Sequence, residues 1–443
     1  MRGLRSFFGL VVILVALGAY LYFVDSKRTP GDEGPKKEKV FNVEADKIEE
    51  ISIKAESGEQ TTLRKTGTDW QIVSPAAAKP DTSEVSGLTS NLSSLEIQRV
   101  VDENPPDLKE YGLANPRVEV AFKTGGQSHT LQIGQKTPPG SDLYAKRGSE
   151  KKVFLIASYL DSTFNRKTFD LRDKTALHVD RDKVDNLEVI TPERTMRFAK
   201  ADNEWRLTAP TAGRADFSAV EGLAGRIAGL QMKSVAADTA DAKKFALEKP
   251  AATVRIGTGS SQATLAIGGK AEDGVYARDL SRPIVFTIDA TLLDDLKKDP
   301  FQYRQKDLFD ARSFNSTRLE IVRAGQAHVF EKTKSKNKEG QEEEKWRQVS
   351  PQARDVDQTK VESLLSAITG AQATAAGTDA AKPALAKPEL TVAIKNDDGK
   401  KEDRVTLARS GKTAFASRAS EPGPVTLDVS TVDSIVKALE ELK

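Results

Sequence analysis

The 443-residue sequence contains no cysteine. Disulfide bonds, cysteine-ligated zinc, thiol nucleophiles and a lipid-modified N-terminal cysteine are therefore all excluded. Neither charge sign is in excess, because 67 basic residues and 65 acidic residues leave a formal net charge of +2. Nucleic-acid-binding proteins usually carry a basic excess, so the composition argues against a nucleic-acid partner. Aromatic residues make up only 6% of the chain, and three of them are tryptophans.

Histidine is also scarce, with three residues in the chain: His129, His178 and His328. All three lie in or beside expected strands, and none is four residues from another, the spacing with which a helix presents two metal ligands. We expect solvent-facing strand residues here. The sequence accordingly predicts no enzyme, no metal site and no cofactor.

Two glycine-containing motifs match nucleotide-binding loops only in part. "SGKT" at residues 410–413 lacks the required earlier glycine, because position 406 is Thr406, and it lies between two expected strands. "GTGSSQ" at residues 257–262 lacks the third glycine of a dinucleotide fingerprint. We therefore reject a phosphate-binding loop at 410–413 and predict a hairpin at 257–262.

Long hydrophobic runs are absent except at the start of the chain. Residues 7–24, "FFGLVVILVALGAYLYFV", carry no charge after a six-residue tail, 1–6. At about 1.5 Å per helical residue this run nearly spans a bilayer core, so it predicts a transmembrane anchor. The alternative is a cleaved signal peptide, but Leu17 occupies the place where a cleavage site needs a small residue.

Residues 25–40 are rich in charge, proline and glycine and predict a flexible linker. Basic residues flank the run on both sides, with Arg2 and Arg5 before it and five lysines or arginines within the linker. A literal charge count favours a cytoplasmic body. Because long domains cross membranes largely regardless of charge, we expect a cytoplasmic N-terminus and a periplasmic body, anchored in the bacterial inner membrane.

The three tryptophans belong to one phrase that occurs three times: "TDWQIVSP" at 68–75, "NEWRLTAP" at 203–210 and "EKWRQVSP" at 344–351. Each tryptophan precedes a proline by five residues, and an aspartate follows six residues after the proline. The three sets are Trp70, Pro75 and Asp81; Trp205, Pro210 and Asp216; and Trp346, Pro351 and Asp357. Agreement at such fixed offsets indicates three copies of one module.

Apolar residues follow each aspartate after four, seven and eleven positions, a spacing that forms one stripe of an amphipathic helix. The stripes are Val85, Leu88 and Leu92; Val220, Leu223 and Ile227; and Val361, Leu364 and Ile368. Each aspartate is predicted to be the helix N-cap, and Glu84 to complete a capping box in the first copy. A general-acid role for the aspartates is the alternative, which the cap makes unnecessary.

Short alternating runs precede each tryptophan and predict a three-stranded meander. A proline-containing phrase, three or four further strands and a second helix follow. The expected fold class is α+β, with three tandem modules at 41–173, 174–310 and 311–443, in which the tryptophan closes the sheet onto the helix. Tyr144, Tyr276 and Phe415 occupy equivalent strand positions. We interpret them as packing residues, with a ligand-binding platform as the alternative.

The third module carries an almost wholly charged segment at residues 333–344. An electrostatic docking loop and a solvated hairpin tip are both compatible with it, and the solvated tip is the simpler interpretation.

The N-terminal span followed by tryptophan phrases and by "YGLANP" at 111–116 resembles the bacterial family called domain of unknown function 4340. Its sharpest residues are Tyr111, Gly112, Leu113 and Pro116, with "FAL" and "PAL" in the later copies. The resemblance implies a membrane-anchored protein that accompanies gliding-type ABC transporter components, and it implies no catalytic residue.

We therefore expect a non-enzymatic, single-span membrane protein whose partners are the inner membrane, through residues 7–24, and ABC transporter subunits. The alternative is a periplasmic protein that binds an envelope glycan or peptide between its modules. An uncharacterised hydrolase is a third hypothesis, which clustered carboxylates in a cleft would favour.

Overall fold

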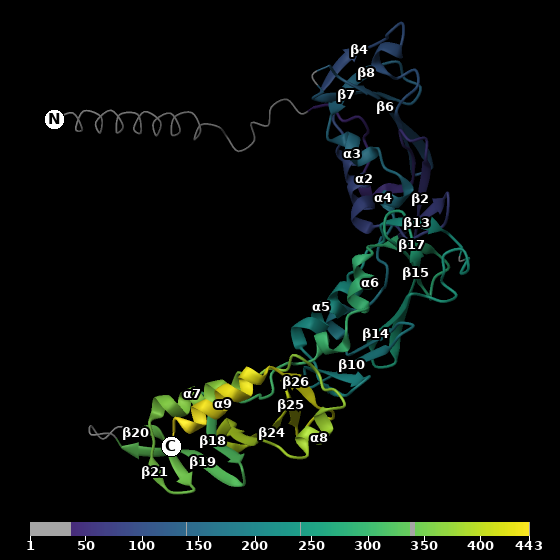
Figure 1. Ribbon diagram of the computed structural model, residues 1–443. Helices are drawn as coiled ribbons and strands as arrows, with labels where there is room; N and C mark the ends of the chain where they lie inside the picture. Colours follow the sequence, from purple (N-terminus) through teal and green to yellow (C-terminus); the bar gives the residue numbers. More distant parts are fainter. Residues whose placement is uncertain (1–36, 139, 240, 337–341, 443) are drawn as a thin grey trace, which may run out of the picture. The chain divides into compact units, whose positions relative to one another are not determined.

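The computed structural model describes residues 37–138, 140–239, 241–336 and 342–442 (Figure 1). The chain divides into two compact units, the first ending at Asp173 and the second beginning at Lys174. The predicted membrane span, residues 7–24, lies outside the described residues. Within the described ranges, no helix is both long and apolar enough to cross a membrane.

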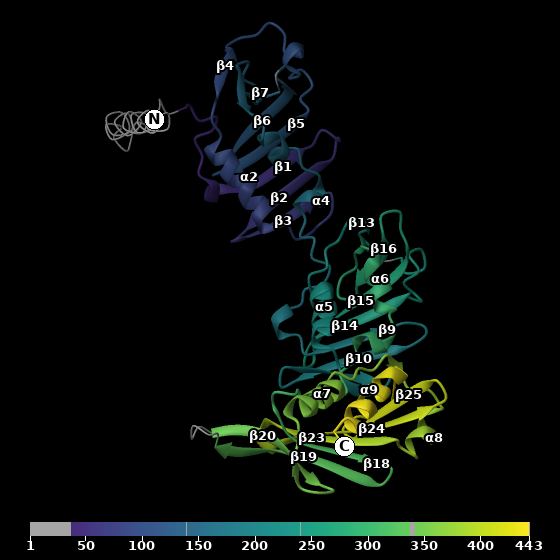
Figure 2. The ribbon, with the colours of Figure 1, turned by 60° about the vertical axis from the view of Figure 1, so that its left-hand side comes forward.

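The first unit is built on one eight-stranded sheet in the order β3-β2-β1-β5-β6-β7-β8-β4. Its strands are β1 (Ile48–Lys54), β2 (Gln60–Thr66), β3 (Asp69–Ser74), β4 (Arg99–Asp102), β5 (Val118–Thr124), β6 (Gln127–Lys136), β7 (Asp142–Arg147) and β8 (Val153–Ala157). Its α-helices are α2 (Thr82–Ser94), α3 (Leu160–Phe164) and α4 (Thr168–Leu171). Figure 2 shows α2 beside β1 to β3, and the buried stripe of α2 joins the same core as those strands.

The second unit contains two nine-stranded sheets. The first runs β12-β11-β10-β9-β14-β15-β16-β17-β13. Its strands are β9 (Asn186–Ile190), β10 (Thr195–Ala201), β11 (Glu204–Ala209), β12 (Gly213–Arg214), β13 (Ser234–Ala237), β14 (Ala252–Thr258), β15 (Ser261–Lys270), β16 (Val275–Asp279) and β17 (Val285–Ile288). Helices α5 (Phe217–Ala228) and α6 (Thr291–Leu296) accompany it, with a 3-10 turn at Pro300–Tyr303.

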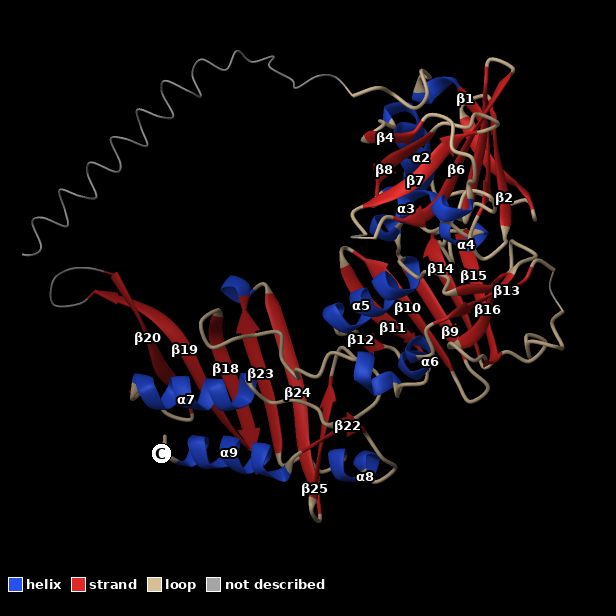
Figure 3. Ribbon diagram, turned by 90° about the horizontal axis from the view of Figure 1, so that it is seen from above, coloured by secondary structure: helices blue, strands red, loops and turns tan. Residues whose placement is uncertain are grey.

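The other sheet of this unit runs β21-β20-β19-β18-β23-β24-β25-β26-β22. Its strands are β18 (Ser316–Arg323), β19 (Gln326–Lys336), β20 (Glu342–Ser350), β21 (Arg354–Asp355), β22 (Ala375–Ala376), β23 (Leu390–Asn396), β24 (Lys401–Ser410), β25 (Thr413–Arg418) and β26 (Val425–Leu427). Its helices are α7 (Gln358–Thr369), α8 (Ala381–Leu385) and α9 (Val429–Glu440). Helices α7 and α9 lie side by side across one face of this sheet (Figure 3).

The three sheets share one topology, which confirms a predominantly antiparallel fold repeated three times. In each, a meander is followed by a helix, and the next strand crosses to the far edge of the sheet before four further strands fill the middle. The crossing strands β4, β13 and β22 were not expected from the sequence. They contain four, four and two residues, too few to show an alternating pattern.

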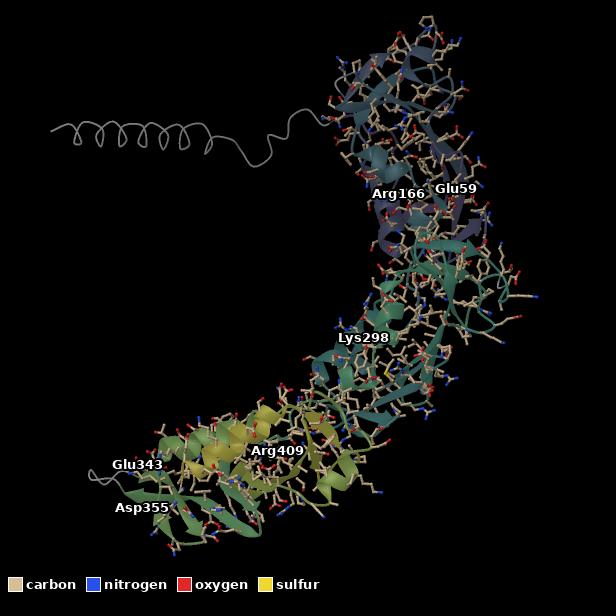
Figure 4. The ribbon with its side chains drawn as sticks, in the orientation of Figure 1. Glu59, Arg166, Lys298, Glu343, Asp355 and Arg409 are labelled. Atoms are coloured by element: carbon tan, nitrogen blue, oxygen red, sulfur yellow. The ribbon has the colours of Figure 1, made fainter. Side chains whose placement is uncertain are left out.

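The three predicted helix stripes are buried beneath α2, α5 and α7. Each signature aspartate is the N-cap of its helix and accepts hydrogen bonds from backbone N–H groups of the first turn. The capping-box prediction for Glu84 is wrong. The Glu84 carboxylate instead pairs with Arg166, labelled in Figure 4, at 3.0 Å, while the Asp81 N–H donates to the carbonyl of Leu171.

Two further expectations are corrected by burial. The end of the segment assigned to the linker is part of the first unit, because the Val40 N–H donates to the Leu95 carbonyl at 2.7 Å and Val40 is 2% exposed. His328 does not face solvent and is only 8% exposed. His178 is exposed, and His129 is half-buried and stacks on Phe122.

Candidate functional site: the tryptophan edge of each module

Each signature tryptophan lies on the strand next to, or at, one edge of its sheet: Trp70 on β3, Trp205 on β11 and Trp346 on β20. Trp205 and Trp346 are 2% and 3% exposed, whereas Trp70 is half-buried. The signature prolines follow cis peptide bonds in all three copies, at Pro75, Pro210 and Pro351. Each tryptophan's strand pairs with the preceding strand of the meander (β2, β10 or β19) through one of its two hydrogen-bonding sides. We call the opposite side of the tryptophan's strand the tryptophan edge.

In the second module the indole ring is held by charged neighbours. The Trp205 Nε1–H donates to the carboxylate of Glu221 on α5 at 2.8 Å, which joins the strand to the helix. Lys200, directly opposite on β10, also bonds Glu221 at 2.5 Å and lies 5.6 Å from the ring centroid. These bonds, the Lys200 bond first, hold the pKa of Glu221 below its ordinary value.

The backbone of Trp205 also has a partner along this edge. The Ala215 N–H, in the segment that returns toward α5, donates to the Trp205 carbonyl at 3.1 Å. Lys200 directs its own N–H to Asp185 on the opposite side, so the Trp205 peptide groups point outward.

In the third module a side chain fills the same edge. Gln358 Oε1 accepts from the Trp346 N–H at 2.6 Å, and Gln358 Nε2 donates to the Trp346 carbonyl at 2.9 Å. One primary amide therefore occupies both outward backbone groups of Trp346. Lys332 lies 5.4 Å from the centre of the Trp346 ring, as Lys200 lies near Trp205.

The first module leaves the corresponding groups open. Lys65, opposite Trp70, points to the Asp46 carbonyl instead of the indole ring. Pro80 stands where the second module has Ala215, and proline has no N–H to donate to the Trp70 carbonyl. Thr82 stands where the third module has Gln358. In the part of the chain that the structure describes, Trp70 makes no hydrogen bond outside the β2–β3 ladder.

A groove of about 470 Å³ lies against this open edge. Its lining consists of Asp69, Trp70, Gln71, Ile72, Ala77, Ala78, Lys79, Pro80 and Thr82. Ile72, two residues beyond Trp70, is bonded in both directions to Ala78 at 3.0 Å. Residues 79–80 continue along this edge from Ala78 and pair on their other side with the segment at 171–173, through the bridge of Pro80 with Arg172 and the bond from the Asp173 N–H to the Lys79 carbonyl.

The equivalent groove of the second module, about 510 Å³, is shared with the third module. It is lined by Glu204, Trp205, Arg214, Ala215, Phe217, Gln305, Asp310, Asn315, Asn396, Asp397 and Lys401. Phe217 is 50% exposed, and Lys200 lies 5.4 Å from its ring centre. Aromatic, amide and charged groups thus meet at one site between two modules.

A buried ion-pair network fastens the second module to the third beside this groove. Arg304 Nη2 lies 3.1 Å from the Glu421 carboxylate, and their side chains are only 8% and 10% exposed. Arg214 pairs with the other Glu421 oxygen. Burial raises the pKa of Glu421, but the bonds and charges of Arg214 and Arg304 outweigh it, so the net pKa is lowered.

Arg418 extends the network within the third module. It pairs with Asp310 at 2.6 Å and with the buried carboxylate of Asp403. Asp403 also accepts from the backbone N–H groups of Asp310 and Ala311 at 2.7 and 2.8 Å, which fixes the segment joining the two modules. Cations and carboxylates alternate through the joint, so each buried charge has a partner of opposite sign.

The residues of "YGLANP" form a second arrangement, away from the tryptophan edge. The Tyr111 ring packs on Tyr144 at 5.1 Å between centroids, and Phe245 packs on Tyr276 at 4.8 Å in the second module. Gly112 has a positive φ of 66°, which glycine adopts without strain, and Leu113 is 2% exposed. Pro116 is half-buried, two residues before β5.

A glycine on β6 makes room for this turn. A Cβ on Gly134 would overlap the Tyr111 carbonyl oxygen and lie 3.0 Å from Leu113 Cγ. Gly268 has the same relation to the Phe245 carbonyl. In the third module the corresponding strand residue is Ala408, and the turn is replaced by helix α8. The turn and the strand glycine are therefore both absent from the third module.

The remaining candidates fall in structural positions. The "SGKT" segment joins β24 to β25 and the "GTGSSQ" segment joins β14 to β15, both as hairpins. Phe415 is buried in its strand. Among the described residues, no group of three or more histidine, aspartate or glutamate side chains is arranged to hold a metal ion. The described residues of the charged segment extend β19 and β20, with Lys336 opposite Glu342.

Three copies of one antiparallel sheet, each crossed by helices and bounded by a tryptophan edge, define a tandem-repeat α+β protein. The chain belongs to the family described as domain of unknown function (DUF4340), which it matches over residues 70–210 and 205–390. Both matched regions begin at a signature tryptophan, Trp70 or Trp205. No curated protein matches the chain.

Solved structures with detectable similarity include DNA polymerase sliding clamps from Pseudomonas aeruginosa. One, crystallised with a ligand, is 8% identical, with 88% of this chain and 93% of that chain covered and a TM-score of 0.16. Another, bound to griselimycin, is 9% identical, with coverages of 88% and 92% and a TM-score of 0.15. These TM-scores are too low to support any inference about this chain.

Proposed function

We propose that this chain is a non-enzymatic scaffold subunit, anchored in the bacterial inner membrane by residues 7–24, with its modules in the periplasm. It would hold proteins of an ABC-type transport or envelope machine at fixed spacing. The observation that carries the proposal is the joint of Arg304, Arg214 and Glu421. A scaffold must transmit position from one module to the next, and a nearly enclosed network of ion pairs resists bending there.

The membrane anchor and the association with a transporter are supported by observations other than the ion pairs between the second and third modules. The apolar run at residues 7–24 supports the anchor. Similarity to family members that accompany gliding-type ABC transporter components supports the partner. Tandem modules suit such a role because several weak contacts on one chain combine into strong binding.

Cross-linking in native membranes, mild detergent extraction and identification of copurifying proteins test the proposal. Stoichiometric recovery of ABC transporter subunits is expected. A matched variant, Glu421→Gln, should reduce that recovery, whereas Glu362→Gln on the exposed side of α7 should leave it unchanged. Recovery of the protein alone would overturn the scaffold role.

The orientation has its own test, which the lack of cysteine makes simple. A single cysteine in place of Ser335, near the end of β19, should react with a membrane-impermeant maleimide in intact cells with a permeable outer membrane. Protection of that thiol, while a periplasmic control protein is labelled, would place the body in the cytoplasm. The N-terminal sequence of the mature protein would distinguish an anchor from a cleaved signal peptide.

Binding of an envelope glycan or peptide is a second candidate function. The groove between the second and third modules favours it, because Trp205 and Phe217 lie there beside the amides of Gln305 and Asn315. Copurification of glycan or peptide fragments with an otherwise solitary protein would support this alternative. Substitution of Phe217 by alanine should then release the fragments.

A further inference from the structure

We infer that the groove between the second and third modules binds an N-acetylated sugar chain, with Phe217 against a sugar ring and three polar side chains around its acetamido group. This inference rests on the second candidate function, ligand binding in this groove, and names the chemical class of the ligand. The groove volume of about 510 Å³ lies within the range of roughly 300–1,000 Å³ that is typical of small-ligand sites.

The backbone along this groove is already paired, so an added peptide strand has no open edge there. The Ala215 N–H donates to the Trp205 carbonyl at 3.1 Å, and Ala215 pairs on its other side with Arg304. The Gln305 N–H donates to the Arg214 carbonyl at 3.0 Å. A ligand must therefore be recognised by side chains and not by a row of backbone peptide groups.

The charges of the lining argue against an acidic ligand. Its two cations, Arg214 and Lys401, both have carboxylate partners within the chain. Arg214 pairs with Glu421 in the joint, and Lys401 lies 3.1 Å from Asp397. The carboxylate of Glu204 lines the same groove and makes no hydrogen bond or ion pair with any residue that the structure describes. A neutral ligand with an N–H or O–H donor suits this balance.

Two amide side chains in the lining supply donors. Gln305 Oε1 accepts from the Lys306 N–H at 3.0 Å, and Asn315 Oδ1 accepts from the Arg312 N–H at 2.8 Å. Each oxygen is therefore held by the backbone, whereas neither NH₂ group has a partner among the described residues. One amide comes from each module, so a ligand that accepts from both would connect the two modules.

Phe217 supplies an apolar surface beside these polar groups. It is the first residue of α5 and is 50% exposed, whereas the Trp205 ring is only 2% exposed. Lys200 lies 5.4 Å from the Phe217 ring centre and is bonded to Glu221 at 2.5 Å, which gives the ring a fixed neighbour. One face of a sugar ring carries mainly C–H groups, and it buries apolar area when it packs on an aromatic ring.

An acetamido group matches the three polar side chains and the aromatic ring together. Its carbonyl oxygen accepts one hydrogen bond from the NH₂ of Asn315 or Gln305, and its N–H donates to the Glu204 carboxylate. Its methyl group and the attached sugar ring cover Phe217. A sugar that carries a hydroxyl in place of the acetamido group offers no methyl group and a shorter reach. The groove is thus predicted to distinguish N-acetylated sugars from unmodified ones.

The test compares matched ligands and matched variants of the full chain held in nanodiscs. The ligands are the trimer of N-acetylglucosamine, the β-1,4-linked trimer of glucose and N-acetyl-trialanine, a peptide with the same acetyl group. Phe217→Thr introduces the residue that Thr82 provides in the first module, and Asn315→Asp keeps the oxygen that Arg312 needs but removes the NH₂ group. Phe314→Thr is the control, because Phe314 is 81% exposed and does not line the groove.

Isothermal titration calorimetry measures the affinities, and saturation-transfer NMR identifies the ligand protons that contact the protein. We expect the N-acetylglucosamine trimer to bind the wild type and Phe314→Thr equally, with its acetyl methyl protons in contact. Its Kd should rise about tenfold in Phe217→Thr and in Asn315→Asp, and the glucose trimer should bind the wild type about tenfold more weakly.

No binding of the N-acetylglucosamine trimer, or equal binding to the wild type and both groove variants, would overturn the inference. Tighter binding of N-acetyl-trialanine would identify a peptide as the ligand and would also overturn it. Equal binding of the glucose trimer would contradict the assignment of the acetamido group.

The outcome is separable from the functions on which it builds. Peptide fragments that copurify with the wild type and are lost from Phe217→Thr would keep ligand binding in the groove and overturn the sugar. Transporter subunits that copurify equally with the wild type and Phe217→Thr would support the scaffold role whether or not the sugar trimer binds.

Discussion

Arg304 and Glu421 face each other across 3.1 Å between the second and third modules, and neither side chain is more than a tenth exposed. Arg214 completes the pairing from the second module, so one carboxylate of the third module satisfies two cations of its neighbour. The geometry makes Glu421 the residue on which the joint depends. Removing its charge would leave the buried Arg304 without its carboxylate partner, while Arg214 would keep its pairing with Asp310.

Glu421→Gln is therefore expected to destabilise the second unit by about 3–5 kcal/mol, the usual cost of breaking a buried ion pair from one side. Urea unfolding followed by circular dichroism measures the change. Glu362→Gln, on an exposed position of α7, serves as the control and should stay within about 0.5 kcal/mol of the wild type. Equal stability of the two variants would show that the joint contributes nothing.

The joint should also weaken in acid. The pKa of Glu421 in the folded chain lies below its ordinary value of 4.5, and that of Asp310 is likewise lowered, since pairing with Arg418 and Arg214 outweighs burial. A carboxylate with a lowered pKa stabilises the fold fully above its unfolded-state value and loses that contribution as pH falls through the folded value.

The stability gap between wild type and Glu421→Gln should thus be largest at neutral pH and shrink progressively below pH 4.5. Parallel urea titrations across that range measure it. A gap that is independent of pH would mean that the substitution acts through packing and not through charge.

The repeat itself was readable from sequence because its markers are rare or periodic. The tryptophan, the helix stripe and the capping aspartate are each specified within a few neighbouring residues, so spacing alone places them. Local patterns also predicted the meanders, the hairpin at 257–262 and the place of 410–413 between two strands. All of these features depend on contacts between residues that are close together in the chain.

The features that sequence reasoning missed depend on contacts distant in the chain. Glu84 looked like a capping-box residue, but Arg166, 82 positions later, holds its carboxylate. The burial of His328 and the two-residue strand β22 likewise arise from neighbours that no local pattern reveals. The lack of a partner at the outward peptide groups of Trp70, among the described residues, likewise depends on tertiary contacts, although Pro80 and Thr82 differ from Ala215 and Gln358 at the aligned positions.

The close approach between Gly134 and the Tyr111 carbonyl gives a further prediction. Gly134→Ala should destabilise the first unit by about 1–3 kcal/mol, because the new methyl group would overlap a backbone oxygen that cannot move freely. Gly87→Ala, in helix α2 with no atom within 4 Å of the added carbon, should instead stabilise by about 0.5–1 kcal/mol. Urea unfolding measures the change in the free energy of unfolding for each variant. We expect a decrease for Gly134→Ala and an increase for Gly87→Ala.

The signature aspartates are predicted to act through hydrogen bonding and not through acidity. Asp81 accepts from the Ser83 and Glu84 N–H groups at 2.8 and 3.2 Å. Asp81→Ala should cost about 1 kcal/mol, whereas Asp81→Asn keeps an acceptor oxygen and should cost much less. Thermal unfolding of both variants measures the difference. Equal losses would point to the charge itself, through the helix dipole or another partner.

The amide of Gln358 provides the last prediction, since it tests whether one side chain determines the state of a tryptophan edge. Gln358→Thr gives the third module the residue that Thr82 gives the first, and removes two hydrogen bonds to Trp346. Because each such bond contributes about 0.5–1.5 kcal/mol, the Trp346 amide should exchange with solvent at least about tenfold faster. Gln352→Thr, at an exposed position near the same edge, is the control. Unchanged exchange in Gln358→Thr would mean that burial of the Trp346 ring, and not the glutamine amide, protects the edge, and openness at Trp70 would then have to be attributed to its half-buried ring.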